Sequence, residues 1–317
     1  MATTASSPFS NSDREDTCLV DVSSAVLKAN GRSLLPFRAM FASLSTGQTL
    51  AFDRYGDTSA PPVVLLHGLS DSRLGYRAVV EHLRQRWNGL QILNVDLRGH
   101  GESSRADLDT YDAQSYADDI AAFISEHVRR PAIVVGHSLG GVVAASLGAS
   151  HPDLVTALFL EDPPFGEGDD EVRNASPVAA FFPKMIRAVQ ELQARNADAA
   201  SFARLAETTH PSERADRCET LRRWDSTTMQ AAIDGIVWRN FNPAATLPMP
   251  MTILRADPAV GAVFAPTDVP VVKAANPHAD IVMVPHASHG IHDTPTRAAY
   301  LDQLDRFLGQ QVPTDQS

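Results

Sequence analysis

The sequence predicts an α/β protein with a mostly parallel, doubly wound sheet and a helical cap inserted after the sixth strand. Short apolar runs alternate with helical patterns along most of the chain, whereas residues 165–247 show helical patterns alone. In residues 131–148, PAIVVGHSLGGVVAASLG, a strand-like run enters a glycine, serine and glycine sequence and then a run of small residues. An ordinary turn does not need glycines on both sides of a serine. A serine in a sharp strand-to-helix bend does, so the pattern indicates such a bend.

The first half of the chain supplies the alternation. Residues 1–36 have little periodicity and are expected to form a flexible N-terminal arm. Residues 37–57 predict two strands around a Thr46-Gly47 turn. Buried strands are then expected within 63–68, 90–104, 132–135 and 157–164, and helices at 74–86, 113–128 and 139–150.

The second half begins with the interruption and returns to the alternation. Strands are expected within 250–258 and 279–290, with a closing helix after Pro295. The predicted core therefore comprises residues 37–164 and 248–312, and the predicted cap comprises 165–247. Because parallel strands end at one edge of a sheet, we expect the cap to lie over the strand ends.

Composition excludes several function classes. The 317 residues carry a net charge of −11, and no Lys/Arg-rich run suggests nucleic-acid binding. Cys18 and Cys218 are too few and too far apart for a disulfide framework or a zinc site. The polar N-terminus lacks a signal-peptide pattern, and no apolar run is long enough for a membrane span. We expect a cytoplasmic enzyme.

Ser138 is the candidate nucleophile, and a serine hydroxyl needs a base to take its proton. The loop after the last predicted strand, VPHASHGIHD, offers His286, His289 and His292. A loop at this place lies near the serine bend, and we choose His289, which is set between Ser288 and Gly290. A metal site built from the three histidines is disfavoured, because no carboxylate or cysteine cluster joins them and the serine would be unexplained.

An acyl-transfer site also needs donors for the oxyanion that develops on the substrate. The backbone N–H of Leu139, directly after the serine, is one candidate. The loop after VVLLHG supplies the other, the N–H of Leu69, because His67-Gly68 permits a close backbone approach. No metal or cofactor is needed for this chemistry.

The motifs LLHGLSDS, DLRGHGES, GHSLGG, LFLEDPP and ASHGIH, in this order, resemble those of the α/β-hydrolase fold family over about residues 37–310. The resemblance implies that Ser138 and His289 belong to a catalytic triad. Most relatives place the acid in a G-x-x-D turn after the next-to-last strand, but here that region reads ILRADPAVGAVF and offers only Asp257.

Glu161, after the strand next to the serine strand, is the alternative acid. Haloalkane dehalogenases and zearalenone-lactone hydrolases use an acid at this place, and the EDPPF string is similar to the latter group. We favour Glu161 over Asp257. Asp162 ranks third, because it would point to the opposite side if the strand continued.

The predicted cap is rich in large apolar residues, and Phe165, Trp238 and Phe241 near its ends are the expected pocket residues. An apolar cavity favours a hydrophobic small-molecule ester or lactone as substrate. The predicted function is therefore a serine hydrolase that acts through an acyl-enzyme. A C–C bond hydrolase or a perhydrolase could use the same triad, and a low-turnover ligand receptor could share the fold.

Overall fold

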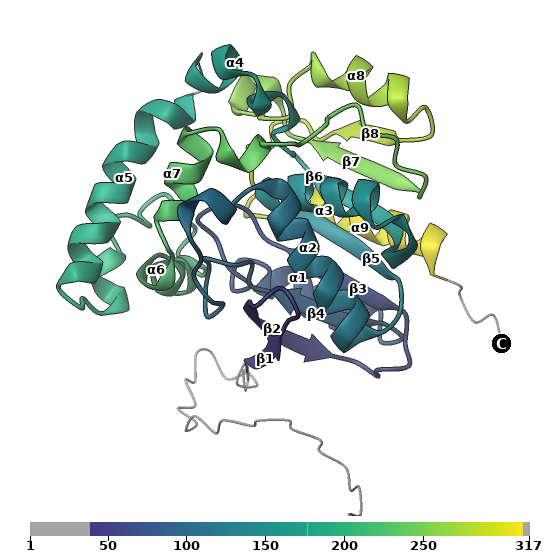
Figure 1. Cartoon of the computed structure of the whole chain (residues 1–317), viewed down its shortest axis with the longest axis horizontal. Helices are drawn as coiled ribbons and strands as arrows, with labels where there is room; N and C mark the ends of the chain where they lie inside the picture. Colours follow the sequence, from purple (N-terminus) through teal and green to yellow (C-terminus); the bar gives the residue numbers. More distant parts are fainter. Residues whose placement is uncertain (1–38, 176, 313–317) are drawn as a thin grey trace, which may run out of the picture.

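Eight strands form one sheet in the order β1-β2-β4-β3-β5-β6-β7-β8 in the computed structural model, which describes residues 39–175 and 177–312 (Figure 1). β1 pairs antiparallel with β2, and β2 pairs antiparallel with β4, whereas all later neighbours are parallel. The predicted fold class is thus confirmed. The strands are β1 Met40–Ser43, β2 Thr49–Tyr55, β3 Pro62–Leu66, β4 Gln91–Val95, β5 Ala132–His137, β6 Val155–Glu161, β7 Met251–Arg255 and β8 Asp280–Met283.

The first two strands form the predicted hairpin. Gly47 has φ 84°, a left-handed conformation, and its N–H donates to the carbonyl of Leu44 at 3.0 Å. β1 begins at Met40, and residues 37 and 38 of the predicted hairpin lie outside the described residues. The N-terminal arm predicted for residues 1–36, which includes Cys18, lies outside the described residues.

Helices cover both faces of the sheet. Successive side chains of each central strand point to opposite faces, so each face has an apolar cluster of its own. Along β3, Val64 and Leu66 join one apolar cluster, and Val63 and Leu65 join the other. Helices α2 Ala113–Phe123 and α3 Leu139–Ser150 cover the first face, and α1 Arg77–Arg86 and α9 Arg297–Gln311 cover the second. The helix predicted for 113–128 changes at Ile124 into a π-helical turn.

Residues 165–247, here called the inserted segment, connect β6 to β7 through helices in the described chain. The helices of this segment are α4 Asp170–Ala175, α5 Pro177–Ala194, α6 Arg214–Arg223 and α7 Thr227–Ile233. The next helix, α8 Asp268–Ala275, follows β7 and lies outside the segment. Figure 1 shows α5, α6 and α7 gathered beside one another, away from β7 and β8. The segment has its own apolar cluster, which includes Met185, Val189, Phe202, Leu221, Trp224 and Met229.

Among the described residues, none of the helices combines the length and the apolar character that crossing a bilayer requires.

Candidate active site

A serine occupies the bend between β5 and α3. Ser138 has φ 51° and ψ −115°, a region that a residue with a side chain rarely adopts. The bend brings backbone groups so close that a Cβ on Gly136 would lie 2.3 Å from the carbonyl oxygen of Gly140. The glycine before the serine is therefore a steric requirement of the bend, and the strained serine is held at the carboxyl end of its strand.

His289 connects this region to a buried carboxylate. It lies in the loop between β8 and α9, and its Nδ1 is 2.8 Å from Oδ2 of Asp162. Because a carboxylate accepts, Nδ1 carries the proton and Nε2 has a lone pair available. The side chain of His289 is 34% exposed and that of Asp162 is 0% exposed. The imidazole thus links a fully buried acid to the cavity that Ser138 lines.

Asp162 is held in place by backbone donors from the chain that follows β7. Its Oδ1 accepts from the N–H groups of Ala256 at 3.1 Å and Phe264 at 3.3 Å, and its Oδ2 accepts from that of Val263 at 2.9 Å. Together with His289 these bonds use both oxygens, so the carboxylate cannot turn without losing several of them.

The expectation that Glu161 or Asp257 contacts His289 is wrong. Glu161 binds His292, and Asp257 accepts from the N–H groups of His286 and Ala259, both at 2.9 Å. Asp162, the residue ranked third, makes the contact instead. β6 ends at Glu161, and Asp162 has φ 41°, so the chain turns there and the alternation that would have sent Asp162 to the far side stops.

Glu161 and His292 form a second carboxylate–histidine pair beside the first. The N–H of His292 donates to Oε1 of Glu161 at 2.8 Å, and Nδ1 lies 2.8 Å from Oε2. Burial alone would lower the pKa of His292, but the charges of Glu161, Asp293 and Asp71 and the hydrogen bond to Glu161 together outweigh it and raise this pKa to about 10. Burial would raise the pKa of Glu161, but charged His292 lowers it. The pair is therefore ionic.

His137 lies between the two histidines. Its ring centroid is 4.7 Å from that of His289 and 4.8 Å from that of His292. Burial lowers the pKa of His137 well below its usual value, although Glu161 opposes this. Its Nε2 lies 3.2 Å from the carbonyl oxygen of His289, which can only accept, so neutral His137 donates this bond and anchors the backbone of His289.

The loop after β3 approaches the serine closely. A Cβ on Gly68 would lie 2.7 Å from Nδ1 of His137 and 3.3 Å from Cβ of Ser138, so only glycine fits. Leu69 follows and lines the cavity, as does Leu139, the first residue of α3. Within the described residues the Leu69 N–H donates to no protein acceptor. The Leu139 N–H, at a helix N-terminus, has no partner within its own helix.

A cavity of about 230 Å³ adjoins Ser138 and His289. Its wall is mainly apolar and comes from both the sheet loops and the inserted segment. The lining includes Leu69, Leu139, Pro164, Phe182, Ala232, Ile233, Val237, Trp238 and Val263, together with the polar residues Ser70, His137, Glu167, Arg173 and Asn174.

Of the three expected pocket residues, Trp238 lines this cavity, where its indole N–H donates to the carbonyl of Pro164 at 2.8 Å. Phe165 and Phe241 do not line it. Phe165 is buried in the core, with its ring centroid 5.1 Å from Phe241 and 5.8 Å from Phe264. Aromatic packing thus directs these two rings away from the cavity.

The described geometry, a strand–serine–helix bend with a histidine–carboxylate pair beside it, can be compared with known proteins. A model of the Alpha/beta hydrolase family matches residues 63–299. The chain belongs to the alpha/beta hydrolase family.

Two relatives match part of the chain. The sn-1-specific diacylglycerol lipase ABHD11 of Mus musculus is 35% identical over 107 residues, 34% of this chain and 34% of that protein. Lipase LipV of Mycobacterium tuberculosis is 36% identical over 125 residues, 39% of this chain and 46% of that protein. The chain thus matches between a third and a half of the length of these relatives.

Solved structures match over a greater length. A hydrolase from Pseudomonas aeruginosa PA01 has a TM-score of 0.65 at 21% identity, and the match covers 87% of this chain and 100% of that one. At this identity the likeness establishes the alpha/beta hydrolase fold.

In this alpha/beta hydrolase chain, sequence reasoning missed most of the cavity wall. Phe182, Ile233 and Val237 carried one signal, large apolar side chains within the inserted segment, which many packing residues share. Glu167 and Arg173 carried no signal, because a charged residue in a helical segment is ordinarily interpreted as solvent-exposed.

The three loop histidines do not form one set of metal ligands. His286 is exposed, whereas His289 and His292 bind different carboxylates. The donor atoms of His137, Glu161 and His292 do lie within 4.8 Å of one another. Both Glu161 oxygens, however, already bind charged His292, and His137 donates to a carbonyl. This donor set suits an ion pair better than a metal, which needs neutral histidines.

Proposed function

We propose that the chain is a serine hydrolase that cleaves a carboxylic ester or lactone of a hydrophobic small molecule, with Ser138, His289 and Asp162 as its triad. The contact between Nδ1 of His289 and Asp162, at the edge of the cavity that Ser138 lines, is the observation that carries this proposal. It supplies what a serine nucleophile needs, a base whose tautomer and orientation are fixed by a third group.

In the first half of the reaction, Nε2 of His289 takes the proton of Ser138 as Oγ attacks the acyl carbon. The carbonyl double bond opens, and the N–H groups of Leu69 and Leu139 bind the resulting oxyanion. Asp162 stabilises the imidazolium. The bond from acyl carbon to leaving oxygen then breaks, and the imidazolium gives that oxygen its proton, which leaves an acyl-enzyme.

In the second half, His289 takes a proton from water as the water oxygen attacks the acyl carbon. The bond to Oγ breaks, Ser138 recovers its proton from His289, and the acid is released. Ser138 and His289 thus return to the protonation states in which they began.

Two features support the substrate class. A cavity of about 230 Å³ with a mainly apolar wall suits a small hydrophobic acyl or alkyl group. The string EDPPF at residues 161–165, similar to zearalenone-lactone hydrolases, is the reason for including lactones. We propose that the inserted segment acts as a cap, because its residues form much of the cavity wall.

Turnover of p-nitrophenyl butyrate by the wild type and by Ser138→Ala tests the proposal, followed by a panel of aryl esters and macrolactones. We expect kcat to fall at least about 10³-fold in the variant, because the nucleophile is removed. Equal hydrolysis by the two proteins would refute the serine mechanism.

A further inference from the structure

The loop that carries Leu69 contains a strained turn. Residues 68–71 form it, and the N–H of Asp71 donates to the carbonyl of Gly68 at 3.1 Å. Ser70, the third residue of this turn, has φ 60°. A left-handed residue at the third position is ordinarily glycine, because a Cβ there is crowded. Leu69, whose N–H we assign to the oxyanion, is the second residue of this turn, so the shape of the turn determines where that N–H points.

A residue of the inserted segment holds this turn. Arg217 of α6 donates through Nη1 to the carbonyl of Ser70 and through Nη2 to its hydroxyl at 3.2 Å. Ser70 is 7% exposed and lines the cavity. The guanidinium therefore binds the carbonyl oxygen and the hydroxyl of the strained residue in the turn, and its planar fork fixes these two atoms in one geometry.

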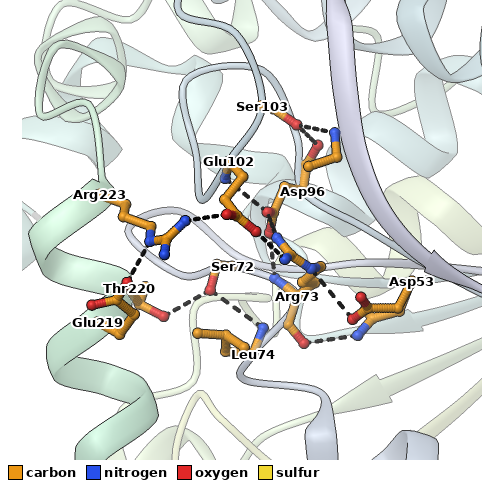
Figure 2. Close-up of polar contacts among 12 residues, drawn as sticks. Asp53, Ser72, Arg73, Leu74, Asp96, Glu102, Ser103, Glu219, Thr220 and Arg223 are labelled. Atoms are coloured by element: carbon orange, nitrogen blue, oxygen red, sulfur yellow. Dashed lines mark hydrogen bonds and ion pairs between the residues drawn. The ribbon is translucent and has the colours of Figure 1, made fainter. Parts of the chain in front are cut away.

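The remainder of the loop has separate anchors, which Figure 2 shows. The hydroxyl of Ser72 lies 2.7 Å from that of Thr220 on α6 and accepts from the N–H of Leu74 at 3.3 Å. Arg73 is buried among carboxylates. It pairs with Asp96 and Glu102 and lies 3.3 Å from Asp53.

An ion pair connects this cluster to α6. Glu102 pairs with Arg223 of α6 as well as with Arg73 (Figure 2). The half of the loop from Ser72 onward is thus fixed to the sheet and to α6, and would stay in place if Arg217 were lost. The half that contains Leu69 and Ser70 is held by the turn's own bond, from the N–H of Asp71 to the carbonyl of Gly68, and by the two bonds from Arg217.

We propose that Arg217 is a positioning residue for the oxyanion site. By holding Ser70 in its left-handed conformation from outside the sheet, it keeps the N–H of Leu69 directed at the reacting carbonyl. This inference rests on the proposed serine hydrolase function, and it makes the geometry of one oxyanion donor depend on the placement of α6.

The test combines Arg217→Met, Ser70→Gly and the double variant. Glycine adopts the left-handed conformation without strain, so Ser70→Gly should make the turn independent of Arg217. Arg214→Met is the matched control, because Arg214 lies on the same helix but donates to the carbonyls of Glu207 and Thr209, inside the inserted segment. Circular dichroism and Tm establish that each variant is folded.

Two readouts are measured for each protein. One is kcat and KM with p-nitrophenyl butyrate. The other is the rate of covalent labelling by an alkyl fluorophosphonate, in which Oγ of Ser138 attacks phosphorus, fluoride leaves, and the phosphoryl oxygen occupies the oxyanion site. Labelling does not require that the natural substrate be known.

We expect Arg217→Met to lower kcat and the labelling rate about 10-fold or more, with KM changed less than about threefold, because a misplaced donor weakens transition-state binding. Arg214→Met should match the wild type. In the Ser70→Gly background, adding Arg217→Met should change kcat less than about threefold.

Two results would overturn the inference while leaving the proposed function intact. One is wild-type kcat and labelling in Arg217→Met. The other is an equal loss from Arg217→Met in both backgrounds, which would mean that Arg217 only docks α6. If labelling of the wild type is absent, or persists in Ser138→Ala, the proposed function itself fails and the inference fails with it.

Discussion

Two carboxylate–histidine pairs lie side by side in this molecule, formed by consecutive acids, Asp162 and Glu161, and by histidines three residues apart, His289 and His292. The distances are the same, 2.8 Å from each Nδ1 to its nearer carboxylate oxygen. The exposures differ, since the His289 side chain is 34% exposed and that of His292 is 3% exposed.

The difference shows that chemical role depends on what surrounds the imidazole. The side chain of His289 lines the cavity beside Ser138. Nε2 of His292 lies instead 3.7 Å from Oδ1 of Asp293, and its ring packs against those of His137, Tyr76 and Tyr300, with centroids 4.8, 4.9 and 5.8 Å away. The same kind of pair is therefore a proposed catalytic base with its acid in one place and a buried ion pair in the other, where it anchors the loop that carries His289.

The largest expected effect comes from Asp162→Asn. The amide N–H₂ would face Nδ1 of His289 and force the tautomer whose Nε2 is protonated, so the base is lost. We expect kcat on p-nitrophenyl butyrate to fall about 10³- to 10⁴-fold. Tm, measured alongside, shows that the loss is not unfolding. Activity within tenfold of the wild type would remove Asp162 from the triad.

Loss of the second pair should lower stability more than activity. Glu161→Gln removes the charge that holds buried His292, and breaking a buried pair costs about 3–5 kcal/mol of unfolding free energy. We expect a marked fall in Tm, and a loss of kcat below about 10-fold, since the change reaches His289 only through its loop. A loss of activity as large as that of Asp162→Asn, without a fall in Tm, would reverse the roles of the two acids.

The pH dependence of stability supplies the signature of the second pair. The folded pKa of His292 is raised from 6.5 to about 10, so its contribution to stability is complete below about pH 6.5 and is lost as pH rises toward 10. The wild type should therefore lose stability over this window in urea titrations, and its advantage over Glu161→Gln should shrink. A constant advantage from pH 6.5 to 10 would contradict an ionic pair.

Features that depend on local pattern could be predicted from the sequence. The hairpin at Gly47, the alternating burial of β3 and the bend at Ser138 each follow from a few neighbouring residues. In each of these cases, the glycine or the apolar alternation admits few other conformations.

The proposed triad acid could not be predicted in this way, because it depends on one backbone angle. A strand that continues through Asp162 would direct its side chain to the opposite face, and a residue before proline is normally extended. Asp162 has an observed φ of 41°, and its carboxylate accepts from N–H donors 94 to 102 residues further along the chain, at Ala256, Val263 and Phe264. Only tertiary contacts decide between the two consecutive acids.

The smallest expected effect concerns Asp257, the acid that the sequence offers in the region after β7, which makes neither kind of pair. Its carboxylate accepts from the N–H groups of His286 and Ala259, which lower its pKa, and so acts as a brace at the start of the histidine loop. An asparagine side-chain oxygen can accept one of these bonds, so Asp257→Asn should leave kcat within about threefold of the wild type. Asp162→Asn, assayed in parallel with p-nitrophenyl butyrate, is the matched control, because the same chemical change is made at an acid that touches His289. If Asp257→Asn instead lost activity by orders of magnitude, the loop would have to rearrange during turnover to bring Asp257 to His289, and the comparison between the two pairs would no longer describe the working enzyme.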